Sequence, residues 1–294
     1  MKKLKASLFI PPLLLSILKR AQSFLRTSYK IGDITISIPR HIDLPNVQKS
    51  HPLYDRFLPV LCKHLTGPKT IVDVGANIGD TAVAMAQHCS NPILCIEPSP
   101  HFYPYLTKNL ELLPKGERFK ALQTMIGTGK FAGELDHSKG TARLVLDSSH
   151  NAIPFVALDS LKDTIRDSIL IKSDTDGFDF DVLLSAKSLI EKDHPILYWE
   201  NEIQGPVQLH GFPLLYEMLQ QEGYDHIHVF DNFGNLLLEG ATVRDLVSLN
   251  DYLHSMRSFN QTRTFYYVDI LATTSLHVNV VNAALADYKK MIQK

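Results

Sequence analysis

The chain has 294 residues, of which 45% are hydrophobic and 21% charged, and these fractions exclude disordered, collagen-like and low-complexity proteins. Its length suits one elaborated domain, or one domain with an arm, and allows a sizeable hydrophobic core that needs no disulfide bonds or structural metal. With 30 Lys and Arg against 31 Asp and Glu, the formal net charge is -1, so the basic excess that supports nucleic-acid binding is missing.

The first twenty residues combine positive charge with hydrophobicity. Lysines precede an apolar stretch, Ala6 to Leu18, which is shorter than the roughly 20 residues that a membrane span needs. The stretch contains Pro11 and Pro12 and shows no small-residue cleavage site, so a secretory signal is not expected. We expect an amphipathic arm that docks on the body or on a second copy of the chain, with attachment of residues 1–20 to a membrane surface as the alternative.

Two further elements are expected before residue 67. Tyr29 to Pro39 alternates apolar and polar residues around a Gly-Asp turn, which predicts a strand or hairpin. His51 to His64 carries apolar residues at helical spacing, which predicts a helix bent near Pro59. Residues 1–66 are therefore assigned to an N-terminal unit of arm, hairpin and helix.

From residue 67 to residue 275, short apolar runs alternate with helical stretches. Runs of this kind are typical of strands buried on both faces, and the alternation predicts right-handed βαβ units around a parallel sheet. The seven strands expected in the main sheet are Ile71–Val74, Ile93–Ile96, Phe119–Ile126, Ser168–Ile171, Ile196–Tyr198, His226–Phe230 and Thr264–Leu271. The helices expected between them are Thr81–Cys89, Pro100–Leu113, Asp159–Arg166, Phe178–Glu191, Phe212–Glu222 and Val243–Met256.

Three segments fall outside this alternation. Residues 127–151 are expected to form an excursion at the edge of the sheet, with a short strand at Ala142 to Leu146. Residues 232–235 predict a hairpin turn into Leu236 to Leu238. Residues 276–294 are expected to be a tail that ends in a polar helix from Ala283.

The three cysteines, Cys62, Cys89 and Cys95, lie in apolar runs and lack metal-ligand spacing. We therefore expect buried free thiols in a reducing compartment and a cytoplasmic protein. No metal site is expected from them.

The loop after the first strand, Asp73 to Thr81, is the first candidate binding segment. In an open parallel sheet, ligands bind outside the carboxyl ends of the strands. Gly75 permits a tight turn, and Gly79 lets the next helix begin close to the strand, so backbone N–H groups face the ligand. The segment is neither the three-glycine dinucleotide pattern nor a P-loop, and a tight turn that binds nothing is the alternative.

Carboxylates follow three further strands. Glu97 ends the second strand, where nucleoside-binding α/β folds place the acceptor of the ribose hydroxyls. After the fourth strand come Asp174, which is expected to point into the crevice, Asp176, which can cap the next helix, and Asp179, which can face the positive end of that helix. Glu200 and Glu202 follow the fifth strand.

These segments together resemble the FkbM family of S-adenosylmethionine-dependent methyltransferases. The matching stretches, in the family's order, are Ile71–Asp80, Ile96–Pro98, Leu158–Asp159, Ile171–Leu183 and Pro195–Glu200. The similarity covers roughly residues 70–202, and His51–Phe57 also resembles an arm found in a polysaccharide-associated subset. The resemblance implies an α/β fold of the class I methyltransferase (Rossmann-like) type, with a seven-stranded, mostly parallel sheet, an antiparallel last strand and helices on both faces.

The resemblance also implies roles for single residues. Four residues would surround the methionine end of the cofactor: Asp73, Gly75, Asn77 and Gly79. Glu97 would hold the ribose, and Met125 and Ile126 would flank the adenine. The family usually has Asp-x-Glu-Gly-x-Glu where this chain has Asp174-Thr175-Asp176-Gly177-Phe178-Asp179. Both glutamates of the family motif are thus replaced by aspartates, Asp176 and Asp179, whose side chains are shorter by one methylene.

The expected activity is O-methylation of a hydroxyl on a sugar, glycan or related small molecule. A hydroxyl is a poor nucleophile, so a base must take its proton, and Asp174 or Asp176 is the candidate, with Glu200 or Glu202 positioning neighbouring hydroxyls. The N-terminal arm and residues 127–151 and 201–212 are expected to line the acceptor site. A divalent metal on the same acids, a NAD-dependent oxidoreductase and a non-catalytic module are the alternatives.

Overall fold

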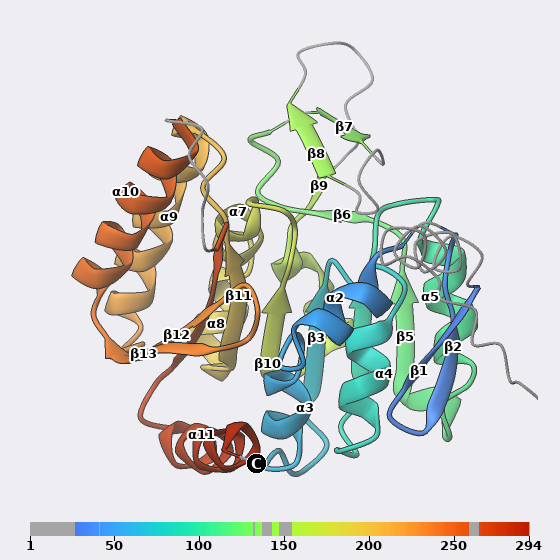
Figure 1. Cartoon of the computed structure of the whole chain (residues 1–294). Coiled ribbons are helices and arrows are strands. Elements are labelled where there is room, and N and C mark those ends of the chain that lie inside the picture. Colours follow the sequence, from blue (N-terminus) through green and yellow to red (C-terminus); the bar gives the residue numbers. More distant parts are fainter. Residues whose placement is uncertain are drawn as a thin grey trace, which may run out of the picture.

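An eight-stranded sheet forms the centre of the computed structural model, which describes residues 27–40, 42–131, 133–136, 143–146, 155–258 and 265–293 (Figure 1). The strand order is β13-β12-β14-β11-β10-β3-β4-β5. In chain order the strands are β3 (Thr70–Val74), β4 (Ile93–Ile96), β5 (Phe119–Leu122), β10 (Ser168–Ser173), β11 (Ile196–Asn201), β12 (His226–Asp231), β13 (Leu236–Ala241) and β14 (Val268–Thr273).

The direction of the strands confirms the class I methyltransferase sheet. From β5 through β4, β3 and β10 to β11, neighbouring strands are parallel, and β14 runs antiparallel between β11 and β12. The strand order reverses direction between β3 and β10, so a crevice is expected where their carboxyl ends diverge.

The eighth strand comes from the predicted hairpin. The turn after β12 leads into β13, which runs to Ala241 and pairs antiparallel with β12, so the hairpin extends the sheet by one edge strand. An edge strand with an open ladder of backbone groups can accept such a partner, which the pattern of residues 236–238 alone does not specify.

The predicted third strand was too long. β5 ends at Leu122, and Met125–Ile126 form a separate strand, β6, which pairs in parallel with β9 (Phe155–Val156). Because β5 is the edge strand with one neighbour, the chain can leave the sheet after four residues while Met125 and Ile126 remain buried. The predicted last strand begins at Val268, and Thr264 lies outside the described residues.

Helices cover both faces of the sheet, as expected. The helices are α2 (Leu44–Ser50), α3 (Phe57–Cys62), α4 (Asp80–Ala86), α5 (Tyr103–Leu110), α6 (Lys162–Ile165), α7 (Asp179–Leu184), α8 (Lys187–Asp193), α9 (Pro206–Gln221), α10 (Val243–Ser258) and α11 (Val278–Ile292). One core cluster joins the sheet to α6–α10, and the second joins it to α3, α4, α5 and α11. Consecutive strand residues such as Ile71 and Val72 enter opposite clusters, which explains the short continuous apolar runs in the central strands.

Several helix predictions differ from the structure. The helix predicted from Phe212 begins at Pro206, and the predicted Asp159–Arg166 helix is divided between a 3₁₀ turn (Leu158–Leu161) and α6. The predicted Phe178–Glu191 helix is divided into α7 and α8 at Ser185, whose hydroxyl donates to Val182 O (2.7 Å). The predicted helix from His51 starts at Phe57, and Pro59 lies in its first turn, where a missing N–H costs no bond. The C-terminal helix α11 begins before Ala283 and buries Tyr288 against the core instead of forming a polar tail.

Two hairpins lie outside the main sheet. The hairpin β1 (Ser28–Ile31) and β2 (Ile34–Ser37) confirms the predicted strand pair, and Asn109 of α5 bonds to both backbone groups of Ser37. The hairpin β7 (Gly133–Asp136) and β8 (Arg143–Leu146) stands above the sheet in Figure 1. No described helix is long and apolar enough to cross a membrane. Residues 1–20, and with them the expected membrane-surface or oligomer contact, lie outside the described residues.

Candidate active site

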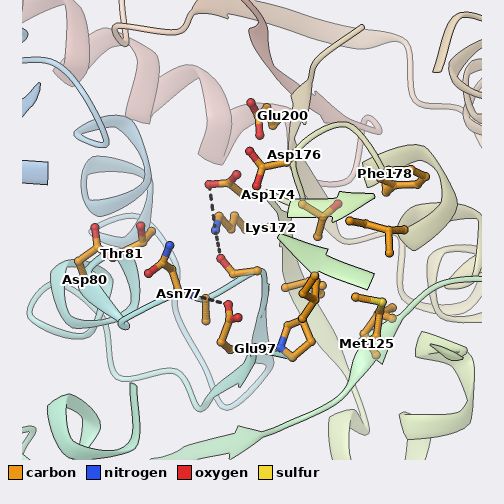
Figure 2. A pocket seen from close by; sticks show the side chains of 18 of the residues that line it. Asn77, Asp80, Thr81, Glu97, Met125, Lys172, Asp174, Asp176, Phe178 and Glu200 are labelled. Carbon is orange, nitrogen blue, oxygen red and sulfur yellow. Dashed lines mark hydrogen bonds and ion pairs between the residues drawn. The ribbon is translucent and has the colours of Figure 1, made fainter. Parts of the chain in front are cut away.

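A cavity of about 350 Å³ opens at the carboxyl ends of β3, β4, β10 and β11 (Figure 2). Its walls also include six residues from positions 42–55 of the N-terminal unit, and Leu135 and Leu144 from the β7–β8 hairpin. The excursion therefore reaches the cavity as expected, whereas residues 201–212 do not line it, and the amphipathic arm of residues 1–20 lies outside the described residues.

The turn after β3 is held by close backbone packing. Gly75 has φ 73°, and a Cβ there would lie 1.8 Å from the carbonyl oxygen of Asp174. Gly79 has φ 81° and precedes α4, and a Cβ there would lie 2.8 Å from Leu106 Cδ1. Both positions thus require glycine, and the turn is pressed against the loop that follows β10.

Glu97 is locked in place at the end of β4. It is 4% exposed, and its Oε2 accepts the N–H of Asn77 (2.8 Å) while its Oε1 accepts the N–H of Ser99 (2.8 Å). Burial raises its pKa to about 7, against the lowering effect of the two N–H groups. Each oxygen keeps a further acceptor position on the cavity side, so the group can accept two hydroxyl hydrogens at once.

Asp73 lies beneath the turn and does not line the cavity. It is fully buried, and its Oδ1 is 3.0 Å from the ammonium of Lys172. Lys172 Nζ also donates to the carbonyl of Gly75 (3.2 Å) and lies 3.5 Å from Asp174 Oδ2. Burial alone would lower the pKa of Lys172, but the charges of Asp73 and Asp174 raise it above its ordinary value.

Lys172 is a site residue that the sequence analysis missed. It is 5% exposed in a strand whose other residues are buried, and it touches both the β3 turn and the β10 loop. A lysine in the middle of an otherwise buried strand was the available signal, because such a cation needs partners. Tyr54, Asp55 and Tyr267 also line the cavity and were not singled out.

Three predicted acids gather on one side of the cavity. Figure 2 shows Asp174, Asp176 and Glu200 close together beyond Lys172. The side chain of Asp174 is 53% exposed, whereas Glu200 is 6% exposed. Burial, followed by the charges of Asp174 and Asp176, raises the pKa of Glu200 well above its ordinary value.

Two other predicted acids serve the protein framework. Glu202 accepts from Arg257 Nη1 (2.9 Å) and does not line the cavity. Asp179 accepts from the hydroxyl of Ser173 (2.6 Å) and from backbone N–H groups of the β10 loop, so it closes the loop at the start of α7. The expected capping role of Asp176 is wrong, because α7 begins after Phe178 without a side-chain cap.

The wall opposite Asp80 and Thr81 is apolar. Met125 and Ile126 line it, as the resemblance implies. Phe155 and Phe178 extend the same wall, and Figure 2 shows Phe178 and Met125 on the side of the cavity away from Asp80 and Thr81. The cavity therefore combines an apolar wall, a hydroxyl acceptor held by two hydrogen bonds and an acidic end, which suits a nucleoside joined to a polar or charged group.

A divalent metal has no evident site in the part of the chain that the structure describes. There, no group of three or more His, Cys, Asp or Glu side chains has an arrangement that would hold a metal ion.

The comparisons with known proteins concern this same region. The family model described as Methyltransferase FkbM domain matches residues 73–226. No curated protein matches the chain.

Solved structures give distant likenesses. Methyltransferase FkbM from Methylobacillus flagellatus is 15% identical, with 60% of this chain and 52% of that chain covered and a TM-score of 0.38. An O-methyltransferase from Bacillus cereus in complex with SAH is 12% identical, with 81% and 93% covered and a TM-score of 0.44. A putative O-methyltransferase from Klebsiella pneumoniae is 14% identical, with 81% and 92% covered and a TM-score of 0.44.

Proposed function

The chain belongs to the FkbM methyltransferase domain family, and we propose that it methylates a hydroxyl oxygen of a sugar, a glycan or a related small molecule. Its cofactor is S-adenosylmethionine, which supplies a methyl group on a positively charged sulfur. The oxygen acceptor and its chemical class go beyond the family match and form the proposal.

The geometry of Glu97 carries the cofactor part of the proposal. Two backbone N–H groups fix its carboxylate at the tip of β4, and the free acceptor positions border the cavity. A ribose carries two adjacent hydroxyl donors, which match the two oxygens. We place the adenine against Met125 and Ile126, and the methionine end near Gly75 and Asn77, with Gly79 shaping the turn and Asp73 supporting it through Lys172.

The acidic end of the cavity supports hydroxyl chemistry. An acceptor hydroxyl becomes nucleophilic as it loses its proton, so a carboxylate within hydrogen-bond reach assists the transfer. Asp174 or Asp176 would take that proton, and Glu200 would hold a neighbouring hydroxyl. We no longer assign Glu202 to the acceptor, because it pairs with Arg257 away from the cavity.

Lys172 would hold Asp174 in position relative to the cofactor turn. Its contacts with Asp174 and with the carbonyl of Gly75 join the base candidate to the cofactor turn. Holding two reactants in alignment is a large part of catalysis by such enzymes, because a small misplacement costs much of the rate.

Calorimetry with S-adenosylhomocysteine tests the cofactor site. We expect binding by the wild type, binding weakened at least about tenfold in Glu97→Gln, and unchanged binding in Glu111→Gln, whose side chain is exposed at the end of α5. Binding of NAD in place of S-adenosylhomocysteine would favour the oxidoreductase, and binding of neither would favour a non-catalytic module.

Transfer of a labelled methyl group tests the acceptor. The protein is incubated with methyl-labelled S-adenosylmethionine and fractions of small molecules and glycans from its source cells. Label that resists mild base on a sugar hydroxyl supports the proposal, because an ether survives conditions that hydrolyse a methyl ester. Label found only on nitrogen, sulfur or carboxyl groups contradicts it.

A further inference from the structure

The cavity carries far more negative than positive charge. Apart from Asp43 at its rim, the carboxyl side chains that line it are Asp55, Asp80, Glu97, Asp174, Asp176 and Glu200. Among the described lining residues, Lys172 is the one lysine or arginine. The whole chain has a net charge of only -1, so the fold concentrates acids at this place.

The acids come from separate parts of the fold. Asp55 lies in the turn before α3 with φ 59°, Asp80 begins α4, Asp174 and Asp176 follow β10, and Glu200 lies in β11. A run of acids in one solvated segment would not bring side chains from four separate segments to one cavity. Asp55 has a left-handed φ, which aspartate adopts more readily than most residues, and it lines the cavity from outside the sheet.

Among these acids, Glu200 gives the strongest indication of a ligand, because its buried carboxylate has no partner among the described residues. It is 6% exposed, it lines the cavity, and within the described residues it has neither a hydrogen bond nor an ion pair. A buried carboxylate without a partner is costly, and a positive ligand nearby would remove that cost.

Lys172 does not neutralise the group. Its closest carboxylate is Asp73, 3.0 Å away, which lies under the turn and outside the cavity lining. Of the lining acids it pairs with Asp174 alone, at 3.5 Å. The positive charge of Lys172 is therefore largely neutralised by Asp73, which does not line the cavity and so does not contact a ligand there.

We propose that the cavity selects its ligand by charge, so that it binds S-adenosylmethionine more tightly than S-adenosylhomocysteine. This inference rests on the proposed function. Methyl transfer breaks the carbon–sulfur bond, leaves its electron pair on sulfur and forms the new carbon–oxygen bond, while the hydroxyl proton goes to a carboxylate. The product thus lacks the positive charge that the acids favour, and its release is assisted by the reaction itself.

The consequence concerns product inhibition. A site that recognised only the adenosine and the methionine ends would hold the product as firmly as the substrate, because these parts are the same in both. A site that also recognises the charge releases the product more readily, which suits an enzyme whose turnover depends on cofactor exchange.

The test compares three ligands by calorimetry on the full chain at several pH values from about 7 to 9, because burial raises the pKa of Glu200 and the preference for a cation requires its carboxylate to be ionised. They are S-adenosylmethionine, S-adenosylhomocysteine and sinefungin, which carries an amine in place of the methylated sulfur. We expect both cationic ligands to bind at least about tenfold more tightly than S-adenosylhomocysteine. In Glu200→Gln and Asp55→Asn that ratio should fall at least about threefold while S-adenosylhomocysteine binds as before, and in the exposed Glu111→Gln it should stay unchanged.

The outcomes separate this inference from the proposed function. If S-adenosylhomocysteine binds as tightly as the two cations, charge selection is wrong and the methyltransferase site stands. If the ratio survives in both Glu200→Gln and Asp55→Asn, the clustered acids are not its cause and the inference fails. If none of the three ligands binds, both the inference and the proposed function fall. Unchanged affinity for S-adenosylhomocysteine in each variant shows that the variant is folded.

Discussion

Lys172 and Asp73 form a buried ion pair, 3.0 Å between Nζ and Oδ1, directly beneath the turn that carries Gly75. Lys172 is 5% exposed and Asp73 is fully buried, so both charges are largely removed from bulk water. Lys172 also reaches Asp174 and the carbonyl of Gly75, so the pair joins β3 to β10 at the point where the strand order reverses. The charge of Asp73 thus acts on the site through Lys172.

Removal of one member of this pair should be costly. In Lys172→Met, Asp73 is left as a buried charge without a cation, and we expect a loss of about 3–5 kcal/mol in the free energy of unfolding, measured by urea denaturation. In the double variant Asp73→Leu, Lys172→Met neither charge remains, so much of the loss should be recovered. A double variant that is no more stable than Lys172→Met would mean that the pair is held by contacts other than mutual charge.

Gly75 should tolerate no side chain. Gly75→Ala combines a left-handed φ with a Cβ placed 1.8 Å from Asp174 O, so the β3 turn and the β10 loop must separate. Gly223→Ala is the matched control, because Gly223 has φ 76° but nothing within 4 Å of its Cβ. We expect Gly75→Ala to lose about 1–3 kcal/mol more stability than the control and to weaken S-adenosylhomocysteine binding by about tenfold or more. Equal losses in thermal unfolding would show that the close approach is unimportant.

The central part of the sheet could be predicted because its strands are buried on both faces. Runs such as Ile93–Ile96 contain no polar residue and fit no amphipathic helix, so their type and order follow from the sequence. The resemblance then added the antiparallel last strand, which β14 confirms. Where β5 ends could not be predicted, because Met125 and Ile126 are as apolar as a strand and only tertiary contacts direct them to β9.

The site could be predicted only where a functional side chain directly follows a strand that the sequence itself predicts. Glu97 follows an apolar strand, and a carboxylate there has few roles other than binding. Asp73 and Glu202 also lie in or near strand ends, yet their partners, Lys172 and Arg257, come from distant segments. Asp55 was missed for a related reason, since it reaches the cavity from outside the βαβ alternation.

Binding of the cofactor product should depend on pH through Glu97. Burial raises its pKa from an ordinary value of 4.5 to about 7, so as pH falls through 7 the group gains a proton and loses acceptor capacity for two hydroxyls. We expect the affinity for S-adenosylhomocysteine to fall below about pH 7, and calorimetry over the neutral range measures this. Glu97→Gln should bind weakly at every pH without this step.

The same group affects the stability of the ligand-free protein in the opposite sense. Because its pKa is raised on folding, the folded state binds the proton more strongly, so the contribution of Glu97 is favourable at low pH and is lost as pH rises from 4.5 through 7. Urea unfolding of the wild type and Glu97→Gln at both ends of this window should show it. A stability difference between the two proteins that does not change with pH would contradict the raised pKa.

The last prediction concerns the base. With the acceptor found by methyl labelling, replacement of the base among Asp174→Asn and Asp176→Asn should lower kcat by about a hundredfold or more, because general base catalysis contributes about 10²–10⁴. The other variant should mainly raise KM, since its carboxylate would only contact the acceptor. Glu202→Gln is the control, because its partner Arg257 lies away from the cavity, and it should change stability without changing kcat. If both Asp174→Asn and Asp176→Asn keep the wild-type kcat, neither residue is the base, and Glu200 and water are the next candidates to take the proton. A pH profile of kcat then separates these two, because the raised pKa of Glu200 would move the acidic limb of the profile upward, and Glu200→Gln would abolish that limb.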